Sequence, residues 1–237
     1  MKERTLLISK RLQEIATFVS QGNTVIDVGC DHAYLPIFLI QKKISPKVFA
    51  FDSRQGPLKQ AKEHILDYEV DKQVELRLSD GLEALQGKEG QTVILSGLGR
   101  KVIQKIVEDR WTETGHIQEW IFSPQSEWEL FYSFLNQYAF VLEDERMIKE
   151  KEKYYLIIKA KRRNLYPLRP QKFTYGTILI QRKDKIFQEY LEKKRAELEE
   201  LEKTISGKSS STVLIRLNEL KAKKQQTQVL IDCISKK

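Results

Sequence analysis

Short apolar runs alternate with longer amphipathic segments between residues 24 and 160. Several of these runs are apolar almost throughout, which is typical of parallel strands that are buried on both faces. Helices are expected between the first five strands and at Glu127–Gln137. The pattern predicts strands at Thr24–Val28, Lys47–Asp52, Gln73–Leu78, Thr92–Ser96, Glu119–Phe122, Phe140–Met147 and Tyr154–Ala160.

This alternation predicts an α/β fold with a doubly wound sheet of seven mostly parallel strands, because parallel neighbours need a crossover between them. Only a polar turn at Lys149–Lys153 separates the last two strands, so they are expected to form an antiparallel hairpin at one edge of the sheet. Residues 1–20 have apolar side chains at helical spacing. They are expected to form an amphipathic helix near the ligand-binding edge of the sheet.

The last third of the chain has a different pattern. Arg162–Pro170 contains two prolines and reads as a linker. Beyond it, positions in alternating steps of four and three run from Ile180 to Ile205 and again from Val213 to Ile234, with a Ser-rich break between the two series. Two such helices predict an antiparallel coiled-coil hairpin. We therefore expect domains at residues 1–163 and 164–237 in a monomer, with a dimerisation arm as the alternative role of the hairpin.

Positive charge is concentrated in that last third. Residues 1–160 carry 22 Lys and Arg against 24 Asp and Glu, whereas residues 161–237 carry 19 against 9. A basic appendage on a nearly neutral domain indicates binding of a polyanion, although a solvated helical surface is the alternative. The candidate phosphate contacts are Lys161, Arg162, Arg163, Arg169, Lys193, Lys194, Arg195, Lys221, Lys223 and Lys224.

The apolar stretches and the cysteines of the sequence indicate the cellular compartment. No apolar stretch reaches the roughly 18 residues that mark a candidate membrane-spanning helix, and the apolar run at residues 6–8 is too short for a signal peptide. Cys30 and Cys233 lie far apart, and neither has a partner at metal-ligand spacing. We expect a cytoplasmic protein with no membrane association, no bound metal and no disulfide.

The first predicted strand ends in Asp27-Val28-Gly29-Cys30-Asp31. Gly29 allows the backbone to approach a cofactor closely. A dinucleotide site would need the pattern G-x-G-x-x-G to hold a diphosphate. One glycine between two aspartates instead suits a ligand with an ammonium group and a sulfonium, so the charges favour S-adenosylmethionine over NAD.

Acidic or turn residues follow the next four strands as well, and open α/β sheets bind ligands at these strand ends. Asp52 is expected to accept hydrogen bonds from the two ribose hydroxyls, with a helix N-cap as its alternative. Asp80 is expected to accept the adenine amino group, with an ordinary turn as its alternative. The remaining residues assigned to cofactor binding are Arg11, Ser53, Gly81 and Gly97.

Four segments of the sequence form a recognisable set: Leu7–Leu12, Asp27–Pro36 (reading D-V-G-C-D-H-A-Y-L-P), Gly56-Pro57 and Asp80-Gly81-Leu82. Together they resemble the bacterial tRNA (adenine-22-N1)-methyltransferase family, TrmK. The resemblance extends over nearly the whole chain. It implies a Rossmann-like class I methyltransferase domain, S-adenosylmethionine as methyl donor, and transfer of the methyl group to N1 of adenine 22 in tRNA.

Two turns depart from the pattern of that family. Arg100 stands where the family has a glycine after the fourth strand, and Ser123-Pro124-Gln125 stands where the family has Gln-Pro-Asn after the fifth. Both turns are expected near the target base. A non-catalytic RNA-binding protein with a degenerate cofactor site is therefore an alternative, as is methylation of another RNA base.

Methylation at N1 makes the adenine cationic, and a nearby carboxylate stabilises the charge that develops. Asp31 is the candidate catalytic residue, with a helix N-cap as its alternative role. The residues expected to contact the RNA substrate are His32, Tyr34, Pro124, Gln125, Arg162 and Arg163.

Overall fold

The structure is a computed structural model that describes residues 6–162, 174–205 and 211–235. The chain divides into two compact units. The first contains Met1–Arg146 and Tyr155–Tyr175, and the second contains Met147–Tyr154 and Gly176–Lys237. The domain boundary expected at residues 163 and 164 lies outside the described residues. The sequence pattern did not assign the tip of the predicted hairpin, Met147–Tyr154, to the second unit.

A seven-stranded sheet forms the centre of the first unit, with the strand order β3-β2-β1-β4-β5-β7-β6. Strands β1 to β5 are parallel to one another, and β7 runs antiparallel to β5. Every residue of β1, β2 and β5 is buried, as expected of strands covered on both faces. The predicted mostly parallel sheet is confirmed. Its strands are β1 (Val25–Val28), β2 (Val48–Asp52), β3 (Val74–Leu78), β4 (Thr92–Ser96), β5 (Glu119–Ser123), β6 (Phe140–Glu150) and β7 (Lys153–Arg162).

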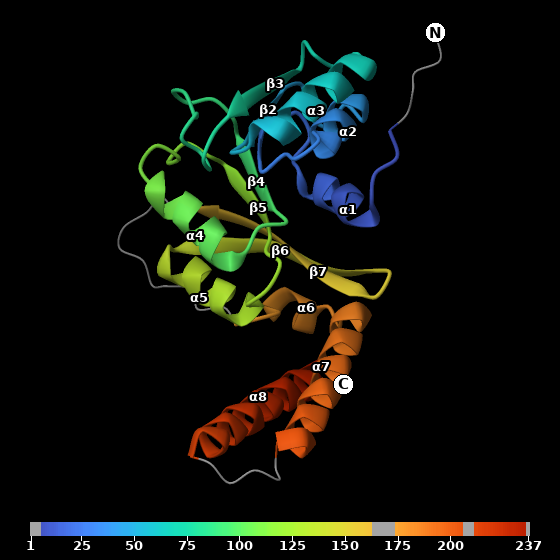
Figure 1. Ribbon diagram of the computed structural model, residues 1–237, viewed down its shortest axis with the longest axis vertical. Helices are drawn as coiled ribbons and strands as arrows, with labels where there is room; N and C mark the ends of the chain where they lie inside the picture. Colours follow the sequence, from blue (N-terminus) through green and yellow to red (C-terminus); the bar gives the residue numbers. More distant parts are fainter. Residues whose placement is uncertain (1–5, 163–173, 206–210, 236–237) are drawn as a thin grey trace. The chain divides into compact units, whose positions relative to one another are not determined.

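Helices cover both faces of this sheet (Figure 1). Helix α1 gathers with α2 and α3 on one face, while α4 and α5 lie together on the other. The strand order reverses between β1 and β4, and right-handed crossovers on either side of that point place their helices on opposite faces. These helices are α1 (Lys10–Phe18), α2 (Tyr34–Gln41), α3 (Gln55–Asp67), α4 (Arg100–Asp109) and α5 (Trp128–Gln137).

Two expectations for the first unit are wrong in detail. The predicted helix over residues 1–20 is too long, because α1 begins at Lys10 and residues 6–9 are not helical. Ser9 caps it by accepting a hydrogen bond from the Leu12 N–H at 3.3 Å. The helix expected between β3 and β4 is a loop, in which Gly81, Gly87 and Gly90 adopt positive φ angles that a helix excludes.

A buried ion pair fixes the end of α1 against the sheet. Lys159 Nζ on β7 lies 2.6 Å from Glu119 Oε2 at the start of β5. The same carboxylate accepts hydrogen bonds from the backbone N–H and hydroxyl of Ser20 and from the hydroxyl of Thr92. Lys159 also donates to the carbonyl of Phe18, the last residue of α1. This network therefore holds the C-terminal end of α1 against the sheet.

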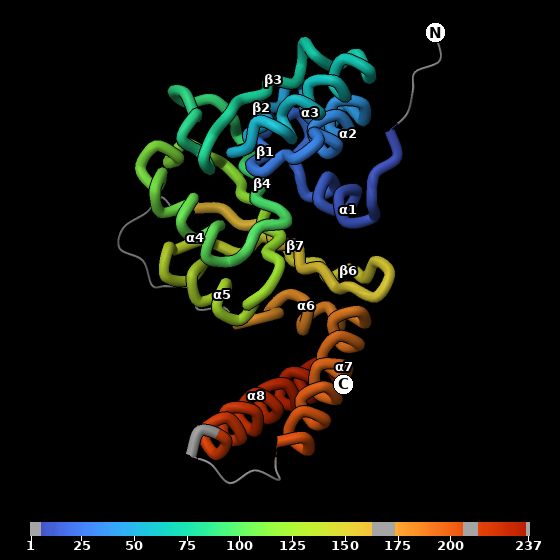
Figure 2. The backbone as a smooth tube through the Cα atoms, in the orientation of Figure 1, coloured from blue at the N-terminus to red at the C-terminus, as the bar shows by residue number. Residues whose placement is uncertain are grey.

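The second unit is mainly a pair of helices, α7 (Lys185–Ile205) and α8 (Ser211–Ser235), which lie side by side (Figure 2). Arg195 bonds Gln228, and Lys224 bonds Glu202. Residue numbers rise along α7 as they fall along α8, so the helices are antiparallel, as predicted. The predicted start of the first helix at Ile180 is wrong.

A separate short helix, α6 (Thr177–Gln181), contains Ile180. Asp184 then interrupts the heptad series, because its carboxylate accepts from the Phe187 N–H at 2.7 Å and so caps a new helix. In the described part of the chain, no helix has the length and apolar character needed to cross a membrane.

Candidate cofactor and catalytic site

The turn after β1 has an unusual backbone. Gly29, Asp31 and Ala33 have φ angles of 75°, 52° and 60°, all in the left-handed region. The N–H groups of Gly29 and Cys30 both donate to the carbonyl of Phe51, at 2.8 and 2.9 Å. Non-glycine residues hold such angles only where their surroundings fix them. The turn is therefore tied to the carboxyl end of β2.

Asp52 closes β2 and lies almost fully buried, with 4% of its surface exposed. Its Oδ2 accepts from the Asp31 N–H at 3.2 Å, and its Oδ1 accepts from the Arg54 N–H at 3.0 Å. Arg54, and not Asp52, is the N-cap of α3. The alternative role of Asp52 as a helix cap is therefore excluded, and its carboxylate stands between the first two strand ends.

Asp27 is buried within β1, beside two charged neighbours. Its pKa is raised to about 7: burial raises the pKa most, the Arg11 guanidinium lowers it, and the Asp52 carboxylate raises it. Arg11 reaches this point from α1 and donates to the Ser96 hydroxyl at the end of β4, at 3.0 Å. A Cβ atom on Gly97 would lie 3.2 Å from Arg11 Nη1, so the glycine makes room for the guanidinium.

These groups form a set of charges that fits an amino acid joined to a nucleoside. Asp27 offers a carboxylate to an ammonium group, and Arg11 offers a guanidinium to a carboxylate. Asp52 still has lone pairs for the hydroxyls of a ribose. Three of the predicted cofactor residues, Asp27, Arg11 and Asp52, thus lie close together at neighbouring strand ends. Arg11 and Asp52 are near enough to shift the pKa of Asp27.

Asp80 and Gly81 lie in the loop after β3. Asp80 is exposed and, with Leu82, borders a cavity of about 360 Å³ whose other wall is α4. Gly81 has a φ of 56°, and a Cβ atom there would lie 2.8 Å from the Ile106 side chain of α4. Glycine is therefore required at this position, because both the backbone angle and the packing exclude a side chain.

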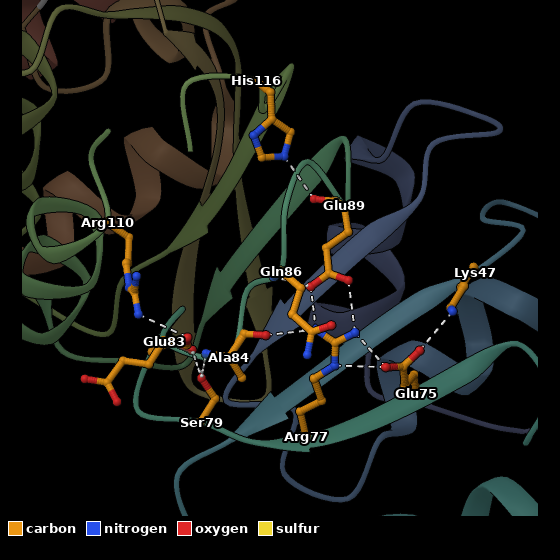
Figure 3. A network of polar contacts seen from close by, with 11 residues as sticks. Lys47, Glu75, Arg77, Ser79, Glu83, Ala84, Gln86, Glu89, Arg110 and His116 are labelled. Atoms are coloured by element: carbon orange, nitrogen blue, oxygen red, sulfur yellow. Dashed lines mark hydrogen bonds and ion pairs between the residues drawn. The ribbon is translucent and has the colours of Figure 1, made fainter. Parts of the chain in front are cut away.

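A network around Arg77 holds this loop (Figure 3). The Arg77 guanidinium bonds Glu75 on its own strand, Glu89 across the loop and the carbonyl of Ala84 at 2.8 Å. It also lies over the Phe49 ring at 4.8 Å. Because these bonds converge on one guanidinium, they fix the loop that carries Asp80 relative to the sheet.

Asp31 lies at the edge of the turn, and 59% of its side chain is exposed. Its carboxylate is 3.6 Å from His32 Nε2 and 3.7 Å from Arg54 Nη2. Ala33, and not Asp31, is the N-cap of α2. The alternative role as a helix cap is therefore excluded, and the carboxylate stays accessible beside the buried Asp52.

Three aromatic rings gather next to Asp31. Tyr34 stacks on His64 of α3 with ring centroids 5.0 Å apart, and His32 lies within 6.0 Å of both rings. His64 Nδ1 is 2.9 Å from the His32 carbonyl oxygen. Tyr34 is 38% exposed, so the cluster presents an aromatic surface beside the carboxylate.

The turns after β4 and β5 are joined to each other. The Gln125 side-chain amide donates to the Gly97 carbonyl at 2.5 Å, and the Gln125 N–H donates to Leu98 O at 3.0 Å. The Pro124 carbonyl accepts from the Trp128 indole at 2.8 Å. The predicted substrate residues Pro124 and Gln125 thus fix the turn that faces Arg11.

Arg100 begins α4, and its guanidinium is bonded along that helix. Its Nε lies 3.3 Å from Glu127 Oε2, and its Nη1 donates to Gln104 at 2.9 Å. Arg100 is the first residue of α4, and its φ angle is not positive. The substitution for glycine therefore needs no left-handed backbone, and the positive charge is paired with Glu127.

Arg162 packs onto the first unit. Its guanidinium lies 3.5 Å above the centre of the Trp111 ring and donates to the Trp111 carbonyl at 2.6 Å. Burial lowers its pKa. These contacts stabilise the end of β7, and contact of Arg162 with RNA stays a prediction. Ser53 is exposed beside Asp52, and Arg163 lies outside the described residues.

Sequence reasoning missed Arg54, His64 and Ser96. Ser96 has a signal in hindsight, since it ends β4, and residues predicted to bind a ligand lie at both neighbouring strands, β1 and β5. His64 has none, because its partner His32 lies 32 residues away, in the turn after β1.

A sheet of this order with acidic residues at the ends of β1, β2 and β3 defines the class of Rossmann-like methyltransferases. The family described as "Methyltransferase domain" matches residues 8–158, and the chain belongs to it.

Proteins named as tRNA methyltransferases are among its relatives. The tRNA (adenine(22)-N(1))-methyltransferase of Bacillus subtilis is 27% identical over 155 residues, which cover 65% of this chain and 65% of that enzyme. A solved structure of a putative tRNA (m1A22) methyltransferase from Streptococcus pneumoniae is 25% identical, with a TM-score of 0.83 over 95% of this chain and 100% of that one. M. capricolum TrmK bound to S-adenosylhomocysteine is 24% identical, with a TM-score of 0.79 over 97% and 100%. The resemblance to the TrmK family is confirmed.

Proposed function

We propose that this protein is an S-adenosylmethionine-dependent methyltransferase that methylates N1 of adenine 22 in tRNA. One observation carries the proposal. Asp27, Arg11 and Asp52 meet at adjoining strand ends, in a chain similar to an enzyme named for this reaction. A tRNA substrate agrees with the cytoplasmic location expected from the sequence.

The cofactor residues have distinct proposed roles. Asp27 binds the ammonium group of the methionine part and Arg11 its carboxylate, while Asp52 accepts hydrogen bonds from the ribose hydroxyls. Asp80 accepts the adenine amino group beside the cavity that it borders. Gly29, Gly81 and Gly97 contribute the left-handed backbone of the turns around the cofactor, and Gly97 leaves room for the Arg11 guanidinium.

Asp31 is the proposed catalytic residue. S-adenosylmethionine, when bound, supplies a methyl group on a positively charged sulfur. Adenine N1 already has a lone pair, so no general base is needed, and the protein must align the reacting atoms. The adenine becomes positively charged as N1 gains the methyl group. The accessible Asp31 carboxylate stabilises that charge.

The aromatic cluster is the proposed platform for the target base. In a base-paired helix, adenine N1 accepts a hydrogen bond from the partner base. The adenine must therefore leave the pair and the base stack before N1 can react. Unstacked RNA bases commonly stack on aromatic side chains. Tyr34 presents such a ring beside Asp31. The Gln125 amide, which already donates to the Gly97 carbonyl, has its oxygen and second N–H left to contact the base.

The second unit is the proposed RNA anchor. Lys193, Lys221 and Lys223 are exposed on α7 and α8. Lys224 and Arg195 are instead bonded across the two helices, so they contribute less to a free basic surface. Phosphate contacts of exposed lysines supply affinity that is largely independent of sequence.

The rival interpretation of a non-catalytic RNA-binding protein rested on Arg100. Its guanidinium is held by Glu127 and Gln104, and the cofactor residues beside it are all present. Arg100 therefore gives no reason to expect a degenerate site. Methylation of another RNA base is the second candidate, and the same assay separates it from the first.

The test is methyl transfer from labelled S-adenosylmethionine to an unmodified tRNA transcript, followed by mass spectrometry of the nucleosides. The proposal predicts N1-methyladenosine as the product. A different methylated nucleoside would establish another target base. Binding of cofactor without transfer to any tRNA would overturn the assignment of tRNA as the substrate.

A further inference from the structure

The carbonyl of His32, in the turn just before α2, lacks a partner within that helix. The first carbonyl in the helical pattern of α2 is that of Ala33, which accepts from the Ile37 N–H at 3.0 Å. One residue earlier, the His32 carbonyl would pair with residue 36, but Pro36 has no N–H to donate. The hydrogen bond must therefore come from outside α2.

His64 supplies it. His64 lies in the last turn of α3, and its Nδ1 is 2.9 Å from the His32 carbonyl oxygen. A carbonyl oxygen only accepts hydrogen bonds, so this geometry places a proton on His64 Nδ1. The bond ties the turn after β1 to a helix that begins after β2.

The backbone of the turn after β1 needs a contact of this kind to hold its conformation. Asp31 and Ala33 are not glycines, yet both have left-handed φ angles, which persist only where surrounding contacts fix them. The other bonds of the turn are local or join it to the end of β2, as when the Asp31 N–H donates to Asp52 Oδ2. Two described polar contacts link the turn to α3: the ion pair between Arg54 at the N-cap of that helix and the exposed Asp31 side chain, and the bond between His64 and the backbone of the turn.

The His64 ring also contacts the neighbouring side chains. It stacks on Tyr34 with an angle of 21° between the rings, and it meets His32 edge-on at 6.0 Å. The ring and its Nδ1 therefore make separable contributions: the ring orients Tyr34, and the nitrogen fixes the backbone that carries Asp31.

We propose that His64 is a positioning residue, whose Nδ1–H holds the Asp31–Ala33 turn so that Asp31 faces the substrate and its N–H stays on Asp52. The catalytic part of this inference rests on the proposed function. The cofactor-binding part rests on the geometry of the turn and on the proposed role of Asp52 as the ribose contact.

Two substitutions in the full-length protein separate the nitrogen from the ring. In His64→Asn, the side-chain amide nitrogen stands close to the place of Nδ1 and still donates, while the ring is lost. In His64→Phe, the ring is kept and the donor is lost. The measurements are the Kd for S-adenosylhomocysteine by calorimetry, kcat on tRNA transcript, and hydrogen exchange of the Ala33 amide.

Loss of one hydrogen bond to a carbonyl that is otherwise unpaired is expected to lower the population of the correctly held turn, relative to the released turn, about tenfold. His64→Phe should therefore weaken S-adenosylhomocysteine binding about fivefold, lower kcat about tenfold and speed exchange at Ala33, each scaled from that cost. His64→Asn should stay within about twofold of the wild type in all three, because the donor is retained.

Equal behaviour of His64→Phe and the wild type would overturn the inference. So would a His64→Asn variant as impaired as His64→Phe, because the ring would then be the group that matters. A wild-type protein that binds S-adenosylhomocysteine but methylates no tRNA would overturn the proposed function alone. The binding and exchange measurements would still decide the role of His64.

Discussion

Asp27 is the residue whose protonation is expected to govern cofactor affinity. Its pKa is raised to about 7 by burial, and only the ionised carboxylate attracts an ammonium group. As pH rises through 7, the carboxylate loses its proton and binding strengthens. Affinity for S-adenosylhomocysteine should therefore be about tenfold weaker at pH 6 than at pH 8, and should level off above pH 8.

Calorimetric titration across this pH range checks the prediction. Asp27→Asn removes the titrating group and should give weak binding with a flat profile. A flat profile in the wild type, or an unchanged slope in Asp27→Asn, would assign the pH dependence to another group.

Asp31 is expected to act on the reaction and not on cofactor binding. Asp31→Ala removes the accessible carboxylate but leaves the backbone N–H that donates to Asp52. Turnover on tRNA should fall by roughly tenfold to a hundredfold, while the Kd for S-adenosylhomocysteine changes less than about twofold. Single-turnover rates and calorimetry separate the two effects. A large loss of cofactor affinity would make Asp31 a binding residue.

At the scale of elements, the ion pair between Glu119 and Lys159 joins β5, β7 and the end of α1. Burial raises the pKa of Glu119, but hydrogen bonds from Lys159, Thr92 and Ser20 outweigh it, and the net pKa is lowered. Lys159→Met leaves a buried carboxylate without its cation. The free energy of unfolding should fall by about 3 kcal/mol at neutral pH.

Urea denaturation measures this loss, with Lys47→Met as the matched control. Lys47 pairs with Glu75 on the surface, where each side chain is 43% exposed, so the control should lose less than about 1 kcal/mol. Because the folded pKa of Glu119 is lowered, its contribution is present at neutral pH. It disappears as pH falls below about 4.3, the ordinary pKa of a glutamate. Equal losses in the two variants would contradict the prediction.

The elements themselves were largely predictable from the sequence. The sequence pattern located all seven strands. Continuous apolar runs marked β1, β2 and β4 most clearly, because burial on both faces leaves that local signature. The failures were at ends and breaks. Ser9 and Asp184 start helices inside segments whose apolar spacing suggested longer ones, since capping competes locally with periodicity.

The candidate site was predictable only where its residues follow strands. Asp27, Asp52 and Gly97 were identified because the ends of parallel strands meet at one edge of the sheet. Arg54 and His64 were not identified, because their roles depend on how α3 packs against the turn after β1. Packing between helices leaves no spacing signal in the chain.

At the scale of the whole molecule, basic residues of the second unit are expected to supply RNA affinity without affecting the cofactor. Charge reversal at the exposed Lys221 and Lys223 should weaken tRNA binding and lower its salt slope by about 0.7 to 0.9 for each phosphate that the variant no longer neutralises. Filter binding at several salt concentrations checks this. The control is the same reversal at Lys72 and Lys88, which are exposed before β3 and β4. An equal effect of the control pair would point to net charge and not to the second unit.

Methylation of N1 at one position of tRNA can be detected by primer extension. A methyl group at N1 blocks base pairing, so reverse transcriptase stops at the modified adenine. We expect a stop at position 22 after incubation of a tRNA transcript with the protein and S-adenosylmethionine, and no stop in a transcript with guanine at that position. A stop elsewhere, or read-through of the transcript despite bound cofactor, would contradict this expectation.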